Sequence, residues 1–507
     1  MRPWWKAGGL ALLVVALVWL VSAWRWQSSG RDVGGTELLL QLVVLPLVLT
    51  GVLLVSLRVA RAMRMAPDIS AAGAPASSLP SGALQADHLQ PDAERTCSAV
   101  VASVAVELPV PGEAAQAVST MLEGVLRPGP DAELSDFDGL PIFCARINEL
   151  DVETALPPSL RDEAPVHVQR SWALLDKVLT HELMALSDAL VPLADADMAE
   201  ASLPSSMPTM KAHLSGVAHP AAVQATQAIR RPHVLLLCAV PAQWNTTWQD
   251  ALHAWLKMRT RDLLPEVGEM DLQIQLLPAE AAHELWSAVD GLLLQWVREP
   301  KCGRRAAVLV VADSAIDAEV VERWQGRGEL FTSAHQVGRI PGEAGVGLLL
   351  LHEQWPGLSA QTPLARLHRP VRQIRDKSAD ALGRIGHVAL LQAMTQAVQI
   401  TGHQAESLNL VVSDGDHRAS RTSEVFEAVL ALFPDLDPMQ GVARAGDSCG
   451  DPGLAAAWLP LALAAGALPH RSPEGLTLAV QVQPSHHRAA VALAPWRAPA
   501  MSSGVPT

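Results

Sequence analysis

Val234–Val240 reads VLLLCAV, a fully apolar run of strand length that opens the most regular part of the sequence. An amphipathic helical pattern follows at 248–263, then a strand-like LQIQLL at 272–277, a second helical pattern at 280–297 and a strand-like AAVLVVA at 306–312. Continuous apolar runs that alternate with helical periodicity are typical of mostly parallel sheets covered by helices on both faces. We therefore predict an α/β fold, and we exclude a β-sandwich and a helical bundle.

The same alternation extends on both sides of this region. Upstream, a β-like run begins at Cys97 (CSAVVASVAVELPVP), and residues 168–193 have helical spacing. Downstream, the pattern predicts strands at 346–352, 408–412, 476–482 and 489–494, and helices at 380–401, 422–432 and 454–468. The series of strands and helices thus repeats once along the chain.

Two apolar stretches precede the α/β region. Ala7–Trp24 and Leu38–Leu57 contain no charged residue, and each could cross a hydrocarbon core of about 30 Å as a helix. The basic residues that flank the pair are Arg2, Lys6, Arg58, Arg61 and Arg64. Because basic flanks favour the cytoplasmic side, we predict a two-helix transmembrane hairpin with the rest of the chain in the cytoplasm. The alternative is a cleaved signal peptide, but no A-x-A-like site follows Ala23 and a second span comes at once.

Charge and cysteine usage limit the partners and the compartment. The net charge of −14 argues against a nucleic-acid surface. The five cysteines are Cys97, Cys144, Cys238, Cys302 and Cys449. They are odd in number, widely spaced and without a CxxC pair, which suits a reducing cytoplasm and disfavours a disulfide framework or a thiolate metal site. We expect no metal and no other cofactor.

Four blocks between about 232 and 496 resemble β-ketoacyl synthases. They are LVVADSAID (309–317), GRIPGEAGVGLLLLHE (338–353), LVVSDGDHRASRTSEVFEAV (410–429) and ARAGDSCGDPGLAAAWLPLALAAGAL (443–468). Their order and spacing resemble the thiolase-like superfamily. The resemblance implies two similar βαβαβαββ halves stacked as a five-layer α-β-α-β-α sandwich.

With this resemblance, the sequence divides into five segments. They are a transmembrane hairpin anchor (1–64), a flexible linker rich in Ala, Ser and Pro (65–94), a first thiolase-like half with an N-terminal elaboration (95–360), a second half (370–497) and a disordered tail (498–507).

The sequence departs from the family at the positions that carry catalysis. A condensing enzyme needs a nucleophilic cysteine at the start of a buried helix, and two histidines, or a histidine and an asparagine, to hold the oxyanion. The matching strand-to-helix junction contains Pro278 and Ala279 and has no Cys, Ser or Thr. The two family histidines fall on Asp414 and Asp451, and a carboxylate there would repel an oxyanion. The resemblance therefore implies the fold and argues against the activity, so we predict a member without catalytic residues.

Other motifs have simpler explanations. Gly446–Gly450 (GDSCG) matches the G-x-S-x-G elbow of α/β-hydrolases, but the preceding GVARA is a poor strand. His181–Glu182 and His283–Glu284 begin like zinc-protease helices but lack the second histidine, so we interpret them as solvated helix positions. The cluster at 414–417 (DGDH) could bind a cation, but a turn rich in Asx side chains accounts for it.

An enzyme-like fold without its reacting groups suits binding. Val106–Val125 and Leu140–Asp151 resemble adaptor proteins of bacterial type VI secretion, which hand a lipase effector to the secretion spike. We therefore expect an adaptor or chaperone, anchored in the bacterial inner membrane, for a secreted effector, and a homodimer is one expected assembly. The alternative is a β-ketoacyl synthase-like protein of lipid or polyketide metabolism that binds acyl groups or an acyl carrier protein.

Overall fold

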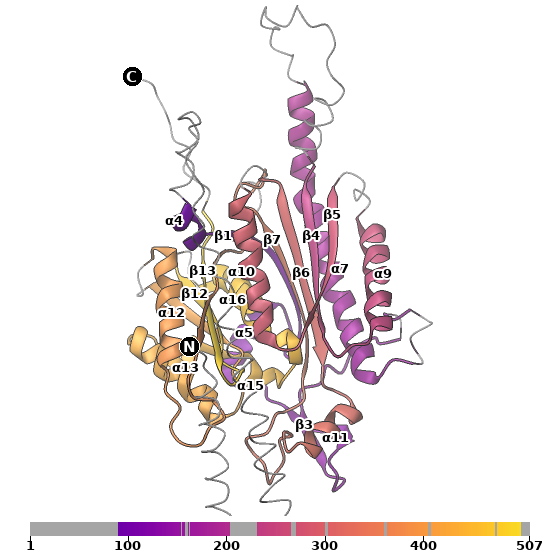
Figure 1. Ribbon diagram of the computed structural model, residues 1–507, viewed down its shortest axis with the longest axis vertical. Coiled ribbons are helices and arrows are strands. Elements are labelled where there is room, and N and C mark those ends of the chain that lie inside the picture. Colours follow the sequence, from indigo (N-terminus) through magenta and orange to yellow (C-terminus); the bar gives the residue numbers. More distant parts are fainter. Residues whose placement is uncertain are drawn as a thin grey trace, which may run out of the picture. The chain divides into compact units, whose positions relative to one another are not determined.

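The computed structural model describes residues 90–497 except 154, 158–160, 162, 203–230, 265–269, 300–302, 359–361, 404–406 and 472–473 (Figure 1). The predicted hairpin at 1–64, nearly all of the predicted linker and the predicted tail lie outside these residues, as does Cys302. In the part of the chain that is described, no helix has the length and apolarity needed to span a membrane.

A mixed sheet of 11 strands runs through the described part of the chain. Its order is β11-β10-β12-β13-β8-β1-β7-β6-β4-β5, and β9 pairs with β13. Its strands are β1 (Ser98–Glu107), β4 (His233–Pro241), β5 (Asp271–Ala279), β6 (Arg305–Ser314), β7 (Glu343–Leu351), β8 (Ala365–His368), β9 (Val371–Ile374), β10 (Leu408–Ser413), β11 (Val442–Arg444), β12 (Leu476–Gln481) and β13 (His487–Ala494). A separate two-stranded sheet pairs β2 (Gly129–Ser135) with β3 (Pro141–Cys144).

The helices lie between these strands along the chain. They are α4 (Gln90–Arg95), α5 (Ala114–Glu123), α7 (Val166–Ser202), α9 (Thr246–Leu263), α10 (Ala282–Arg298), α11 (Ala318–Gly326), α12 (Val388–Thr401), α13 (Ala419–Leu432), α14 (Pro438–Gly441), α15 (Ala445–Cys449), the 3-10 helix η5 (Gly453–Ala457) and α16 (Leu459–Arg471). The sequence pattern located all the long helices except α5.

The same connectivity occurs twice in the large sheet. From one edge the order is β5-β4-β6-β7-β1, and from the other it is β11-β10-β12-β13-β8. Along the chain, both sets contain the series strand, helix, strand, helix, strand, helix, strand, strand. The first set adds α5, the β2–β3 hairpin and α11 to this series, and the second adds β9, α14, α15 and η5. β1 and β8, the first strands of the two sets, pair antiparallel across the middle of the sheet. The prediction of an α/β fold with a repeated series of elements is confirmed.

The expectation of a mostly parallel sheet is wrong. Four pairings in the large sheet are parallel, namely β4 with β5 and β6, and β10 with β11 and β12. Six pairings are antiparallel and involve β1, β7, β8, β9 and β13. An apolar run reports that both faces of a strand are buried, but it carries no information about strand direction.

Three hydrophobic cores separate the layers. One contains apolar residues of α7 and α9 and one face of the first strand set, and another contains those of α12 and α13 and one face of the second set. The third core lies between the two sets and contains residues of α5, α10 and α16 together with strands of both. In Figure 1, α7 and α9 lie on the right, α12 and α13 on the left, and α10 and α16 between them. Both faces of each set are therefore covered.

Local chemistry sets several helix ends. The Asn245 side chain accepts a hydrogen bond of 2.8 Å from the Trp248 N–H and so caps α9. α12 was expected from Asp380 but begins at Val388. The intervening segment is a loop in which Gly383 has φ +86°, and Lys377 Nζ donates to the carbonyl oxygen of Leu382 at 2.8 Å.

Candidate functional site

A cleft of about 910 Å³ opens where several strands of the large sheet end. Its lining includes Ala279 at the end of β5, Asp313 and Ser314 at the end of β6, and Gln483 just after β12. Loops and side chains at the carboxyl ends of strands commonly form ligand sites in α/β folds. All four blocks that resemble β-ketoacyl synthases contribute residues to this cleft.

The strand-to-helix junction at the cleft carries no nucleophile. Pro278 and Ala279 are the last residues of β5, and they pair with Val240 and Pro241 of β4. Ala279 lines the cleft, whereas Pro278 is not among the lining residues. Helix α10 then begins at Ala282 with no side-chain cap. The start of the helix therefore presents backbone and methyl groups to the cleft, and Glu280 just before it adds a carboxylate but no thiol or hydroxyl.

The described thiols are also unsuited to attack a substrate. Cys97, Cys144, Cys238 and Cys449 are free and buried. Burial raises the pKa of Cys449 to about 12 and that of Cys97 to about 11. Within the described residues, no thiol donates a hydrogen bond to an imidazole and none lines the cleft. These groups stay protonated at physiological pH.

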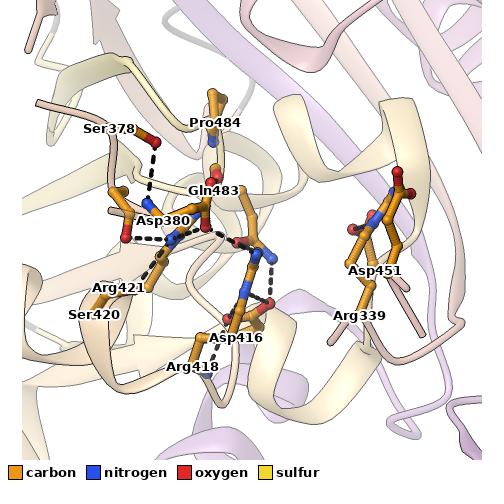
Figure 2. A network of polar contacts seen from close by, with 12 residues as sticks. Arg339, Ser378, Asp380, Asp416, Arg418, Ser420, Arg421, Asp451, Gln483 and Pro484 are labelled. Atoms are coloured by element: carbon orange, nitrogen blue, oxygen red, sulfur yellow. Dashed lines mark hydrogen bonds and ion pairs between the residues drawn. The ribbon is translucent and has the colours of Figure 1, made fainter. Parts of the chain in front are cut away.

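Asp451 lies in the cleft and is paired with an arginine (Figure 2). Arg339 Nε donates to Asp451 Oδ2 at 2.7 Å, and the Gly453 N–H donates to Oδ1 at 3.1 Å. Burial opposes ionisation of this carboxyl group, but the Arg339 guanidinium outweighs it and holds the pKa of Asp451 below its ordinary value. The Arg339 guanidinium also lies 3.9 Å from the ring centroid of Trp324.

Asp414 lies behind the cleft rather than in it. Its Oδ1 accepts hydrogen bonds from the backbone N–H groups of Val482, at 2.6 Å, and Gln483, at 3.2 Å. Burial raises the pKa of Asp414 to about 7, because two backbone donors only partly replace water around the charge. The sequence resemblance aligned Asp414 and Asp451 with family histidines; the structure places Asp451 in the cleft, whereas Asp414 bonds to the backbone of Gln483 and is not among the residues that line it.

The acidic cluster at 414–417 forms a turn. The Arg418 N–H donates to Asp416 Oδ1 at 3.0 Å, which is an Asx turn, and Arg418 Nε donates to Oδ2 of the same side chain at 2.9 Å. Gln483 Nε2 also donates to Asp416 Oδ2 at 2.9 Å (Figure 2). Among the described residues, no group of three or more His, Cys, Asp or Glu side chains could hold a metal ion. The interpretation of this cluster as a turn agrees with the geometry.

Two arginines that line the cleft beside carboxylates were not expected from the sequence. Arg418 Nη2 donates to Gln483 Oε1 at 2.6 Å, and Arg421 Nη2 donates to the Gln483 carbonyl oxygen at 3.1 Å. Arg421 Nη1 lies 2.6 Å from Asp380 Oδ1, while its buried Nε has no hydrogen-bond partner among the described residues. These arginines come from a loop and the start of α13, and no local pattern distinguishes them from solvated helix positions.

Asp313 is a further cleft residue to which the sequence alone gave no role. Its Oδ2 accepts a hydrogen bond of 2.9 Å from the Leu454 N–H, and burial raises its pKa to about 6. A Cβ atom at Gly453, where φ is +59°, would lie 2.1 Å from Asp313 Oδ2. Gly453 therefore allows the start of η5 to approach the end of β6. The signal in the sequence was the Asp-Ser pair directly after an apolar strand.

The remaining motifs lie elsewhere. Ser448 of the Gly446–Gly450 motif is buried in α15 and lines a separate pocket of about 370 Å³ that has no histidine among its lining residues. Glu182 was expected to be solvated, and this is wrong: it is fully buried on α7, and burial raises its pKa to about 8. His283 lines a second cavity, described below.

Comparisons with known proteins relate the chain to ketosynthase-type structures. No protein family matches the chain, and no curated protein matches it. Among solved structures, the chain is similar to the ishigamide ketosynthase/chain length factor, with a TM-score of 0.48 and 13% identity over 79% of this chain and 100% of that one. It is also similar to the oxazolomycin ketosynthase domain OzmH KS7 of Streptomyces albus JA3453, with a TM-score of 0.46 and 13% identity over 80% of this chain and 76% of that one.

Proposed function

We propose that the chain is a non-catalytic, ketosynthase-like protein whose cleft binds an acyl group or receives an acyl carrier protein. The observation that carries this proposal is the junction before α10, where Ala279, Glu280 and Ala281 line the cleft and supply no thiol or hydroxyl nucleophile. Condensation would also need donors toward an oxyanion, and Asp451 offers a carboxylate there. The site retains a cleft but lacks the groups that would form and stabilise a covalent intermediate.

The cleft has features that suit a ligand with an apolar part and an anionic or polar end. Trp244 and Trp248 line it together with the alanines at the start of α10. Arg339, Arg418 and Arg421 line the cleft as well and offer guanidinium N–H donors, although each is paired with a carboxylate. Aromatic rings bury apolar area, and guanidinium groups bind carboxylates and phosphates, so the two together fit such a molecule.

The test separates binding from catalysis in the full-length chain. Incubation with an acyl thioester should leave the intact mass of the protein unchanged, while the thioester changes the tryptophan fluorescence in a saturable manner. Trp248→Ala should weaken that binding, whereas Trp496→Ala, at a half-buried tryptophan outside the cleft, should not. An acyl adduct on the protein, or thioester turnover that survives repeated purification, would contradict the non-catalytic assignment.

A second candidate is the adaptor or chaperone for a secreted effector, and an exposed apolar surface favours it. Phe137, Leu140 and Phe143 lie on the β2–β3 hairpin, and their exposed fractions are 65%, 57% and 43%. The Phe143 ring packs edge-on against Phe331, with the ring centroids 5.7 Å apart. Exposed apolar side chains that gather on one element often mark a surface for a protein partner.

Pull-down from detergent extracts of the full-length chain tests this candidate. Recovery of an effector or a spike component that is lost in Phe137→Ser/Leu140→Ser would support the adaptor, with exposed Leu382→Ser as the control. Recovery of acyl carrier protein alone would favour the first candidate.

We also propose that residues 1–64 anchor the chain in the bacterial inner membrane through two spans, with the remaining residues in the cytoplasm. Support comes from the two uncharged stretches and the basic residues around them. Reporter fusions at Ser29, between the predicted spans, and at the C-terminal end should report opposite sides of the membrane.

A further inference from the structure

A second cavity, of about 860 Å³, lies between the first half of α10 and the β9–β13 strand pair. Its lining residues include His283 and Ser287 from α10, Arg372 from β9, and Gln481 and His487 from β12 and β13. It shares no lining residue with the cleft described above. The proposed function makes no use of it.

A buried amide without partners forms part of this cavity. Gln481 is the last residue of β12 and is 1% exposed. Both its Oε1 and its Nε2 are buried, and neither has a hydrogen-bond partner among the described residues. Buried amide groups are almost always hydrogen-bonded, because they lose their bonds to water on burial. A donor and an acceptor at the wall of the cavity are thus available to a ligand.

Two histidines stack in the same cavity. The ring centroids of His283 and His487 are 3.8 Å apart, and the rings are almost parallel, at 6°. Burial lowers the pKa of His487, and His283 and three further basic neighbours add to that shift. An anion placed beside this pair would favour the protonated imidazole and reverse the shift.

Guanidinium groups complete the positive surroundings. Arg95 and Arg372 are exposed at the cavity, and Arg372 Nη1 donates to Ser287 Oγ. Arg369 donates to Asp290 through Nε at 2.6 Å, and Arg372 Nη2 lies 3.6 Å from the same carboxylate. A single carboxylate, that of Asp290, therefore pairs with two guanidinium groups, and it neutralises only part of their positive charge. Arg95 forms no ion pair with another described residue.

From these contacts we propose that this cavity binds a phosphate monoester. The arginines at the rim and the stacked histidines hold the phosphate, and the Gln481 amide bonds to a hydroxyl or amide group of the organic part. Phosphate suits the rim because its oxygens accept several charge-assisted hydrogen bonds at once. The neutral amide suits a polar, uncharged group.

Titration calorimetry on the full-length chain with inorganic phosphate and glycerol 3-phosphate tests the site. We expect one saturable site for each probe, and Arg372→Ala should weaken both by about fivefold or more. Arg384→Ala is the matched control, because Arg384 is an exposed arginine of the same half that lies outside the cavity. The proposal is overturned if neither probe saturates at about 5 mM or if both variants weaken binding equally.

The amide at the cavity wall has its own readout. Gln481→Leu should weaken the binding of glycerol 3-phosphate by about fivefold, whereas the affinity for inorganic phosphate should change by less than about twofold. A parallel loss for both probes would contradict the assigned role of Gln481. Lysophosphatidic acid carries the same phosphate on a lipid. If lysophosphatidic acid binds more tightly than glycerol 3-phosphate, the natural ligand is a lipid. If the two bind equally, the natural ligand is a soluble phosphate monoester. Either result supports the phosphate site.

A pH series separates the histidine pair from the arginines. The charged and titratable groups around His487 are His283, Glu284, Asp290, Arg369, Arg372, His486 and Arg488. Because bound anion favours protonated His487, sulfate, whose charge is constant from about pH 5 to 8, should bind more tightly as the pH falls. His487→Asn should flatten this dependence. If the pH dependence of sulfate binding is unchanged in that variant, the role given to the histidine pair in anion binding is wrong.

Discussion

Two aspartates near the cleft ionise differently because their neighbours differ. Asp451 faces the Arg339 guanidinium, which holds its pKa below the ordinary value. Asp414 is buried against two backbone N–H groups, and its pKa rises to about 7. At neutral pH Asp451 is therefore an ionised partner of an arginine, whereas Asp414 is protonated in a substantial fraction of molecules.

At the residue scale, Asp451→Asn should lower the free energy of unfolding by about 1 to 3 kcal/mol. It leaves the half-buried Arg339 with Glu329 alone as a charged partner, and that pair is longer, at 3.5 Å against 2.7 Å. Chemical denaturation of the full-length chain measures this change. The control is Arg497→Ala, since Arg497 and Glu474 form an exposed pair with N and O atoms 3.1 Å apart, where the change should stay below about 0.5 kcal/mol. Equal stability of Asp451→Asn and the unmodified chain would contradict the role given to the pair.

Asp414 makes stability depend on pH in the opposite sense to a salt-bridged carboxylate. Its folded pKa of about 7 lies above the unfolded value, so the folded state binds more protons between these pKa values. Its contribution to stability is therefore greatest below pH 4 and is lost as the pH rises toward 7. Asp414→Asn should reduce the loss of unfolding free energy between pH 4 and 7, by an amount on the order of a few kcal/mol. Unfolding measured from pH 4 to 8 checks the slope, and a slope unchanged by the substitution would count against a raised pKa.

At the element scale, two glycines test how backbone conformation stabilises helices. Gly402 ends α12 with φ +71°, and Gly291 lies exposed inside α10. A Cβ atom at either position meets no other atom within 4 Å, so packing does not obscure the comparison. Gly402→Ala should destabilise the protein by about 1 kcal/mol, and Gly291→Ala should stabilise it by about 0.5 to 1 kcal/mol. Thermal unfolding measures both, and shifts of the same sign would contradict this account.

At the scale of the whole molecule, the two strand sets share one core and should unfold together. Trp458 is fully buried in this core, and its Nε1 donates to the Leu285 carbonyl oxygen at 3.2 Å. Trp458→Ala should cost about 3 to 5 kcal/mol, whereas Leu382→Ala, at a position 97% exposed, should change stability by less than about 0.5 kcal/mol. Urea unfolding followed by fluorescence and by circular dichroism should give coincident transitions. Two separated transitions would show that each half is stable alone.

The parts of the fold that the sequence predicted are those with a strong local pattern. β4, β6 and α10 were located within a few residues, because burial of both strand faces and helical amphipathicity recur at short range. The antiparallel direction of β7 and β13 was not predicted, since direction is set by connections and neighbours. The short β8 was missed as well, although it joins the two strand sets.

For the site, the sequence alone identified what is absent and the tertiary structure decided what is present. The missing nucleophile at 278–281 and the aspartates at 414 and 451 are matters of residue type, which one sequence shows directly. Arg339, Arg418 and Asp451 meet in the cleft only because loops from both strand sets converge there. The cavity around Gln481 is of the same kind, since its walls come from segments as distant along the chain as Arg95, His283 and Ala489. Short-range periodicity determines helices and strands, but contacts between distant segments depend on the packing of the whole chain.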